Sequence, residues 1–229
     1  MKYFSTVFLI LSTVLLAHSQ TYEIGGMIGG ANYIGDVGKT NFVNPNTLAL
    51  GGLIKWNRSP RHAFRASVLV AKIEGDDIGS KNTRREQRGY SFQNTVKEVS
   101  VGIEYTFWEF NVHNQRNNST PYLYTGLTYF WYDALYKRGN IITKYDKAGS
   151  VAIPMVVGYK ANLGTNAMVG FEIGARYTFT DNLDGSNPVN DLADDQSLKF
   201  GNTNSDDWYV FTGITVTFAF GRKPCYCNF

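Results

Sequence analysis

The chain has 229 residues, of which 15% are aromatic and 18% are charged, and its formal net charge is +3 at pH 7. This length fits one domain, and the weak net charge gives no support to nucleic-acid binding. No apolar run of about 18 residues follows the N-terminal segment, so we expect no membrane-spanning helix.

The N-terminal segment has the features of an export signal. Lys2 gives a positive start, an apolar run follows, and Ala17-His18-Ser19 offers small residues at a cleavage site. An N-terminal membrane anchor is the alternative, but the apolar run is too short to span a bilayer. We therefore predict a signal peptide over residues 1–19, which is removed on export, and a mature chain that begins at Gln20.

The mature chain alternates between bulky apolar residues and small or polar ones, which is the period of a β-strand. The facing of the fifth segment is the least defined, and Pro154 in the sixth suggests a bulge or a strand start. We count about eight such segments along the sequence: Tyr22–Ile34, Leu48–Trp56, His62–Ile73, Thr95–Phe107, Pro121–Tyr132, Val151–Leu163, Val169–Phe179 and Trp208–Phe220.

The connections between these segments alternate between long and short, which is typical of outer-membrane barrels. Long polar connections, which we expect to be external, are Gly35–Asn46, Glu74–Asn94, Asp133–Gly149 and Asp181–Asp207. The connections that we expect in the periplasm are Arg58–Arg61, Trp108–Thr120 and Gly164–Asn166. The sequence thus predicts an all-β fold, an eight-stranded antiparallel transmembrane β-barrel over residues 20–220 with a filled lumen. A periplasmic tail over residues 221–229 follows, and both termini of the mature chain are periplasmic.

A soluble lipocalin-like barrel or a two-sheet sandwich also has about eight alternating strands. The polar face of such a protein meets water and carries long polar side chains, whereas here Gly, Ala and Ser crowd that face. The apolar faces also end in aromatic residues, which suits the girdles of a membrane barrel. These are Trp56, Tyr105, Phe107, Tyr129, Trp131, Phe218 and Phe220.

Charged residues recur on the face that we predict to line the lumen. They are Glu23, Lys55, Arg65, Glu98, Glu104, Lys160, Glu172 and Arg176, four acids and four bases. Buried charges must pair, and a barrel of eight strands is filled by its side chains. We interpret the set as an ion-pair network that plugs the lumen; a proton or ion path is the alternative.

The sequence offers little support for catalysis or metal binding. His62 and His113, the histidines of the mature chain, fall in or beside predicted turns and lie far apart. We therefore predict no catalytic residues, no cofactor and no metal site. The acidic pairs Asp194-Asp195 and Asp206-Asp207 could bind a cation, but we interpret them as solvated loop residues.

Cys225 and Cys227 lie in the C-terminal tail, beyond the last strand. The periplasm is oxidising, so thiols there tend to be paired, but a bridge across one residue is strained. Three interpretations stay open: a strained local disulfide, a bond to another protein, or a metal or redox site. A cysteine pair on a short tether favours covalent attachment of a partner.

Several stretches resemble the PorG-type outer-membrane proteins of Bacteroidota. They are Tyr22–Gly26, Asn32–Asp36, Lys55-Trp56, Arg88–Phe92, Pro121–Gly126 and Gly221–Cys227. The resemblance covers almost the whole mature chain. It implies a non-enzymatic component of the type IX protein secretion machinery, whose partners are the periplasmic ring lipoprotein and its partner protein.

From the sequence we therefore expect an outer-membrane protein that anchors or organises the periplasmic ring complex at the outer membrane. We expect this work to be done through Trp108–Thr120 and the tail Arg222–Phe229, and we expect no nucleic acid or small-molecule substrate. One alternative is a barrel that binds ligands or surfaces through its external loops, mainly Glu74–Asn94 and Asp181–Asp207. A pore for small solutes is the other.

Overall fold

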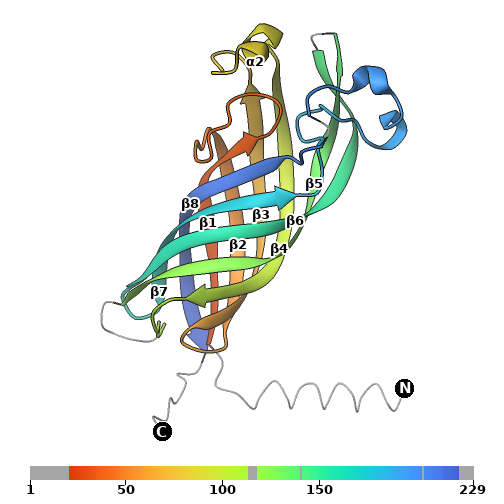
Figure 1. Cartoon of the computed structure of the whole chain (residues 1–229). Coiled ribbons are helices and arrows are strands. Elements are labelled where there is room, and N and C mark those ends of the chain that lie inside the picture. Colours follow the sequence, from red (N-terminus) through yellow and green to blue (C-terminus); the bar gives the residue numbers. More distant parts are fainter. Residues whose placement is uncertain (1–20, 113–117, 140, 203, 222–229) are drawn as a thin grey trace, which may run out of the picture.

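The computed structural model describes residues 21–112, 118–139, 141–202 and 204–221. These residues form a single closed barrel in which eight antiparallel strands follow one another in chain order (Figure 1). The predicted fold class is confirmed. The elements are β1 (Thr21–Ile34), β2 (Thr47–Asn57), β3 (His62–Asp76), α2 (Thr83–Arg88), β4 (Ser91–Thr106), β5 (Ser119–Arg138), β6 (Ile141–Leu163), β7 (Ala167–Thr178), η1 (Asn190–Leu192), η2 (Gln196–Leu198) and β8 (Trp208–Gly221).

The strands are strongly staggered around the ring. The path of paired residues that leaves β1 at Tyr22 returns to β1 at Asn32, ten residues further along the strand, after passing Trp56, Phe64, Ile103, Thr125, Met155, Ala175 and Val210. Such a stagger tilts the strands against the barrel axis. The tilt, which Figure 1 shows, sets the size of the lumen that the inward side chains must fill.

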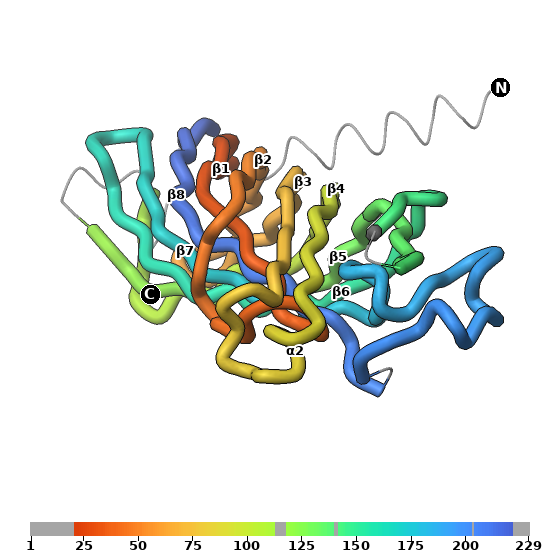
Figure 2. The backbone as a smooth tube through the Cα atoms, turned by 90° about the horizontal axis from the view of Figure 1, so that it is seen from above, coloured from red at the N-terminus to blue at the C-terminus, as the bar shows by residue number. Residues whose placement is uncertain are grey.

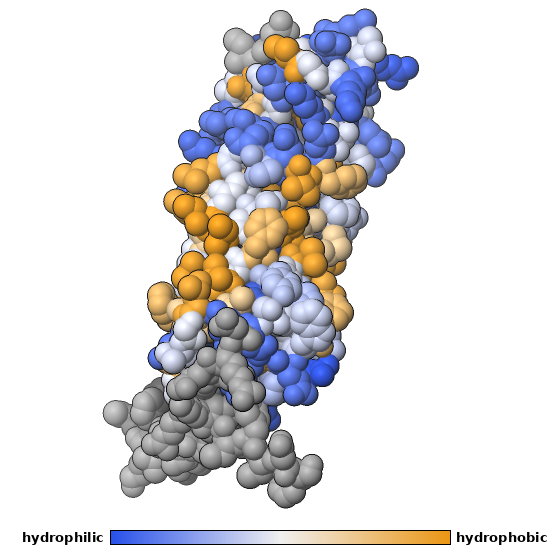
Figure 3. Space-filling view, turned by 90° about the vertical axis from the view of Figure 1, so that its left-hand side faces the viewer, coloured by the Kyte–Doolittle hydropathy of each residue, from blue (hydrophilic) through white to orange (hydrophobic). Residues whose placement is uncertain are grey.

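Exposed apolar side chains occur on all eight strands, and on the face that Figure 3 shows they form a belt between a polar upper end and polar residues below. Ile28, Val101 and Leu127 are each more than half exposed. Such a continuous exposed apolar surface matches the lipid-facing band of an outer-membrane barrel. Among the described residues, none of the helices has the length and apolar character needed to cross a membrane.

Aromatic side chains pair along both margins of the belt. On one margin lie the pairs Tyr22–Phe220, Trp56–Phe64 and Tyr105–Phe107, and on the other lie Tyr129–Trp131, Tyr177–Trp208 and Tyr177–Phe179. Tyrosine and tryptophan favour the boundary between lipid and water. The two margins therefore mark the height of barrel that lipid covers.

The two ends of the barrel differ in how their strands are connected. We call the end with the connections 35–46, 77–90 and 179–207 the loop end, and the end with 58–61, 107–118 and 164–166 the turn end. The predicted loop Glu74–Asn94 is shorter than expected, because β3 and β4 pair as far as Asp76 and Ser91.

The predicted loop Asp133–Gly149 is wrong. β5 and β6 stay paired through this segment as far as Arg138 and Ile141, so that it forms a hairpin arm beyond the barrel. The register shifts between Ala134 and Leu135, opposite Tyr145, and such a bulge increases the local twist. Seen from above, the arm lies on the same side of the ring as segment 179–207 (Figure 2).

Pro154 lies inside β6, and the bulge or strand start predicted there is wrong. Pairing with β5 is interrupted at Gly126 and Leu127 and resumes in the same register. Proline has no N–H to donate, so the interruption affects one side of the strand, while Pro154 still pairs with Arg176 on β7. The structure defines the facing of the fifth strand: Leu127 is exposed on the outside and Tyr122 is buried in the lumen.

Where β1 and β8 reach the loop end, the side chains on their outward face are no longer exposed. Val210 lies on the face that Ile214, Val216 and Phe218 share, but it pairs with Asn32, and both Val210 and Asn32 are buried. The amide of Asn32 donates to the carbonyl oxygens of Asn41 and Phe42, and its Oδ1 accepts from the N–H of Asn44. The connection 35–46 therefore folds back over the outer wall of the barrel.

Candidate functional site

The lumen contains eight buried charged side chains. Alternation along each strand turns every second side chain inward, and the inward positions include all of the charged residues named above. Each is at most 5% exposed: Glu23, Lys55, Arg65, Glu98, Glu104, Lys160, Glu172 and Arg176. The sequence therefore predicted which charges enter the barrel.

Glu104 on β4 is the centre of the largest cluster. Its Oε2 lies 2.7 Å from Lys55 Nζ, and its Oε1 lies 2.6 Å from Lys160 Nζ. Arg65 Nη1 is 3.9 Å from the same carboxylate. One anion thus gathers cations from β2, β3 and β6 and ties strands that are not neighbours in the ring.

A second pair joins β3 to β7. Arg65 donates two hydrogen bonds to the Glu172 carboxylate, of 2.8 and 2.9 Å, in the bidentate geometry that favours this ion pair. Tyr122 donates a third hydrogen bond of 2.7 Å to Glu172 Oε2. The Arg65 guanidinium also lies over the ring of Tyr124, 4.7 Å from its centroid.

A third pair joins β4 to β7 near the loop end. Arg176 donates to both oxygens of Glu98, at 3.2 and 2.9 Å, and Tyr209 donates to Glu98 Oε2 at 2.6 Å. Arg176 Nη1 also donates to the carbonyl oxygen of Gly174 at 2.7 Å. These partners satisfy most of the hydrogen-bonding groups of the buried Arg176 guanidinium and Glu98 carboxylate.

Glu23 is held by neutral groups. Its Oε1 accepts a hydrogen bond of 2.8 Å from Asn57 Nδ2, and its Oε2 accepts one of 2.7 Å from Thr217 Oγ1. Thr217 lies on β8, so this contact crosses the seam between the first and last strands. The other seven predicted residues form the ion pairs described above.

Aromatic side chains fill the space around the ion pairs, a role that was not predicted from the sequence. Tyr122, Phe130, Tyr209 and Phe211 are completely buried. Small inward residues make room for them: a Cβ at Gly158 would lie 2.4 Å from the Tyr122 ring. The sequence does contain a signal for this packing, because inward aromatic residues such as Tyr122 lie opposite glycines such as Gly158. The result is a packed lumen rather than a channel.

The turn end of the lumen is closed by its longest connection. Phe110 is buried with Val112, Met168 and Ala219, and its ring lies 4.8 Å from Lys160 Nζ. Its N–H donates a hydrogen bond to the carbonyl oxygen of Pro60 in the neighbouring turn, at 3.0 Å. The start of the connection therefore folds over the mouth of the barrel, while Trp108 stays 56% exposed.

At the loop end, an ion pair between Arg88 and the buried carboxylate of Asp77 holds two connections together. Arg88 of α2 donates to both oxygens of Asp77, at 2.7 and 3.0 Å, and to the carbonyl oxygen of Asp36 at 2.7 Å. Asp77 Oδ1 also accepts from the N–H of Gly38 at 2.8 Å. The connections 35–46 and 77–90 thus form one hydrogen-bonded unit.

Buried carboxyl groups tie segment 179–207 to β1. The hydroxyl of Tyr33 contacts Asp184 Oδ2 at 2.7 Å and also Asp207 Oδ1. Burial and neighbouring carboxylates raise the pKa of Asp181 to about 8, and burial raises the pKa values of Asp184 and Asp207. A hydroxyl has one proton, so a second proton on one carboxyl group is needed to satisfy both contacts of Tyr33.

A family described as a domain of unknown function, DUF6089, matches residues 1–229. The chain belongs to the DUF6089 family. No curated protein matches it.

Solved structures of small outer-membrane barrels are similar to this DUF6089 protein in fold. The N-terminal β-barrel domain of Pseudomonas aeruginosa OprF is 12% identical, with 89% of this chain and 98% of that chain covered, at a TM-score of 0.45. Neisserial surface protein A is 9% identical, with 88% and 97% covered, at a TM-score of 0.48. A major outer membrane protein from Thermus thermophilus is 15% identical, with 89% and 100% covered, at a TM-score of 0.45. At these values the likenesses carry no argument about function.

The remaining candidate residues of the DUF6089 protein are scattered. His62 lies at the turn end, with Nδ1 3.2 Å from Ser59 Oγ and its ring beside Tyr105. Asp195 caps η2 by accepting from the N–H of Ser197, and Asp207 belongs to the buried carboxyl cluster. Cys225, Cys227 and His113 lie outside the described residues. Within the described part of the chain, no three His, Cys, Asp or Glu side chains are placed to hold a metal ion.

Proposed function

We propose that this DUF6089 protein is a non-enzymatic component of the type IX protein secretion machinery. In this role it anchors or organises the periplasmic ring complex at the outer membrane. The proposal starts from the resemblance of the chain to PorG-type proteins, which extends from Tyr22 to Cys227. Its partners would be the ring lipoprotein and the partner protein of that lipoprotein.

The closed lumen is the observation that supports an anchoring role. Ion pairs and aromatic rings fill the barrel, and Phe110 covers the turn end. A barrel of this kind offers no path for a secreted polypeptide or a solute, so its contribution lies on its surfaces. A filled lumen speaks against the pore that we considered from the sequence.

The turn end has the features of a docking face. Trp108 is exposed beside the mouth of the barrel, next to the belt margin, and tryptophan is enriched at the centres of protein interfaces. At the same end, Arg61 Nη2 lies 3.6 Å from the exposed Glu109 carboxylate. In our proposal this end faces the periplasm, together with both termini and the tail 221–229.

Crosslinking in intact cell envelopes tests the docking face. We expect Trp108→Ser to reduce crosslinks between the barrel and the ring subunits severalfold and to leave the barrel folded. Trp131→Ser is the matched control, because Trp131 is similarly exposed but lies at the opposite margin of the belt. Equal crosslinking by both variants and the unmodified protein would exclude docking through Trp108.

A separate experiment tests covalent attachment through the tail. If Cys225 or Cys227 bonds a ring subunit, non-reducing gels of cell envelopes show an adduct of high mass that disappears when both residues are replaced by Ser. Absence of this adduct from the unmodified strain would exclude the covalent link and leave non-covalent docking in place.

Binding of ligands or surfaces through the loop end is the second candidate function. It is favoured by the ion pair of Asp77 with Arg88, which gives the connections 35–46 and 77–90 a fixed shape. Deletion of residues 78–88 separates the two functions. Secretion survives this deletion if the protein is an anchor, whereas surface binding is lost if the loops carry the function.

A further inference from the structure

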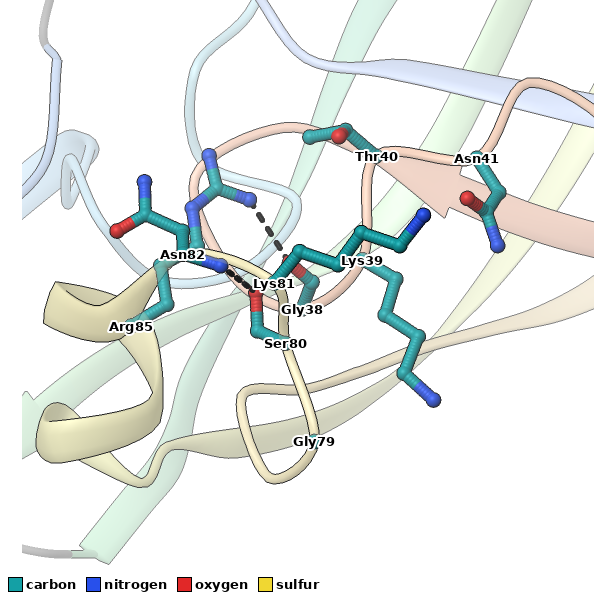
Figure 4. A pocket seen from close by; sticks show the side chains of 9 residues that line it. All are labelled: Gly38, Lys39, Thr40, Asn41, Gly79, Ser80, Lys81, Asn82 and Arg85. Atoms are coloured by element: carbon teal, nitrogen blue, oxygen red, sulfur yellow. Dashed lines mark hydrogen bonds between the residues drawn. The ribbon is translucent and has the colours of Figure 1, made fainter.

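A pocket of about 560 Å³ opens between the connections 35–46 and 77–90 at the loop end. Nine residues line it, among them the cations Lys39, Lys81 and Arg85, and none of the nine is an acid (Figure 4). Arg88, which does not line the pocket, is paired with Asp77. The pocket therefore has an excess of positive charge and the chemistry to hold an anion.

The side chains that line the pocket differ in how they are held. Arg85 Nη1 donates a hydrogen bond of 2.9 Å to the carbonyl oxygen of Gly38, which fixes the guanidinium at the wall. Lys81 extends from the opposite connection toward Thr40 and Asn41 (Figure 4). Lys39 also borders a second hollow that Glu74 and Asp76 line, so its charge is shared between the two.

The connection 35–46 also carries two exposed apolar side chains. Phe42 is 74% exposed and Val43 is 50% exposed, directly after Asn41. The hydrogen bonds of Asn32 hold this stretch against the outer wall of β1. Asn32 lies on the same face of β1 as Ile28, which belongs to the belt. Phe42 and Val43 thus lie where the belt ends, on the side of the barrel that faces lipid.

The pocket and the apolar stretch together match the chemistry of a charged lipid. A phosphate would accept charge-assisted hydrogen bonds from Lys81, Arg85 and Lys39. The hydrocarbon part of the same molecule would meet Phe42 and Val43 at the boundary of the membrane. A soluble anion would use only the cationic pocket and would make no use of the apolar stretch.

We infer that this pocket binds the phosphate group of an anionic glycolipid of the outer leaflet. The inference rests on the orientation in the proposed function, in which the loop end faces outward. It does not depend on a role in secretion. The bound lipid would fasten the connection 35–46 to the membrane surface.

Titration of the purified full-length protein in detergent tests the inference. The probes are bis-phosphorylated lipid A, the same glycolipid with its phosphates removed, and inorganic phosphate, followed by native mass spectrometry. We expect the phosphorylated glycolipid alone to bind tightly. The double variant Lys39→Gln/Lys81→Gln should weaken its binding at least about tenfold, because each cation supplies a charge-assisted contact.

Two further variants complete the test. Arg84→Gln is the matched control, because Arg84 is an exposed cation of α2 that does not line the pocket. The double variant Phe42→Ser/Val43→Ser should weaken binding of the phosphorylated glycolipid severalfold. Equal binding of inorganic phosphate would replace the lipid by a free anion and overturn the inference.

Unchanged binding in the Lys39→Gln/Lys81→Gln variant, or an equal loss in Arg84→Gln, would also overturn it. The secretion proposal is judged separately, by crosslinking to the ring in cells. A variant that loses lipid binding but keeps the ring crosslinks supports the lipid site and leaves the anchoring role intact.

Discussion

Glu104 Oε1 lies 2.6 Å from Lys160 Nζ, although the two residues belong to β4 and β6 and the strand β5 stands between them. The contact crosses the lumen rather than following the hydrogen-bonded ladder. The second oxygen of Glu104 holds Lys55 on β2. Interactions of this kind fix the cross-section of the barrel independently of strand pairing.

Replacement of Glu104 should therefore be costly. Glu104→Gln leaves Lys55 and Lys160 buried without their anion, and we expect the free energy of unfolding to fall by about 3–5 kcal/mol. Urea unfolding in lipid vesicles, followed by tryptophan fluorescence, measures the change. Glu109→Gln is the control, because that carboxylate is 72% exposed in its pair with Arg61. A loss below about 1 kcal/mol in Glu104→Gln would contradict a structural role for the cluster.

The packing of the lumen can be tested at Gly158. A valine there would collide with the ring of Tyr122 and push its hydroxyl away from Glu172. Overpacking and the lost hydrogen bond should together destabilise the barrel by about 2–4 kcal/mol. Gly26→Val is the control, because a Cβ at Gly26 meets its nearest atom at 3.6 Å and points toward lipid. Equal stability of the two variants would mean that the lumen tolerates the extra volume.

The hairpin arm should depend on one tyrosine hydroxyl. Tyr145 lies at the bulge of β6, where its hydroxyl donates to the carbonyl oxygen of Val189 and accepts from the N–H of Val189 at 2.9 Å. Tyr145→Phe should weaken the contact between the arm and segment 179–207 by about 1 kcal/mol. Hydrogen exchange at Val189 should then accelerate, while exchange in the strands of the belt stays unchanged. Acceleration throughout the barrel would show a global effect instead.

The carboxyl cluster should make the loop end sensitive to pH. The pKa of Asp181 is raised to about 8 in the folded loop, whereas an exposed aspartate titrates near pH 4. The folded loop therefore binds the proton more tightly than the open loop does. Its stabilisation is complete below about pH 4 and is lost as the pH rises toward about 8. Asp184 and Asp207 act in the same direction, because their pKa values are also raised.

Hydrogen exchange measures this dependence at Leu183 and Ser186, whose N–H groups donate to Asp207 and Asp184. After correction for the intrinsic exchange rate, protection should fall between pH 5 and pH 8, and Asp181→Asn should flatten the slope. Protection that rises over this interval would show that the carboxyl groups ionise in the folded loop.

The closed lumen also predicts an electrical property. In planar bilayers the unmodified barrel should show no steady conductance, because buried ion pairs and aromatic rings fill the lumen and Phe110 lies over the turn end near Lys160. Phe110→Ala removes this cover but leaves the ion pairs of Glu104, Glu172 and Glu98, so it should remain closed as well. A steady conductance in the unmodified protein would revive the interpretation of the lumen charges as an ion path.

The sequence predicted the strands wherever lipid touches one of their faces. There, selection for apolar residues on one side produces the period of two, as in Val151–Leu163 of β6. In the hairpin arm Leu135 is buried in the hydrophobic core, but Lys144, Tyr145, Asp146 and Lys147 show no alternation, so the strand could not be recognised. Pattern alone therefore located the membrane part of each strand and missed its extension.

The charges of the lumen could be predicted as a set, but their pairing could not. Inward position follows from parity along one strand, whereas the partner of each residue depends on the stagger between strands. Arg65 meets Glu172, which is 107 positions away in the chain. The contact of Tyr33 with Asp184 spans 151 positions and joins a strand end to a loop, so no local signal announces it.

The ion pairs across the lumen also bear on how the protein enters its membrane. Glu98 and Glu104 on β4 are neutralised by residues of β2, β6 and β7, and Glu23 on β1 is held by Thr217 on β8. A half-inserted sheet would present these groups to acyl chains before their partners had arrived. Insertion and ring closure should therefore occur as one cooperative event, in which the last hairpin to arrive completes the shielding of charges contributed by all the others.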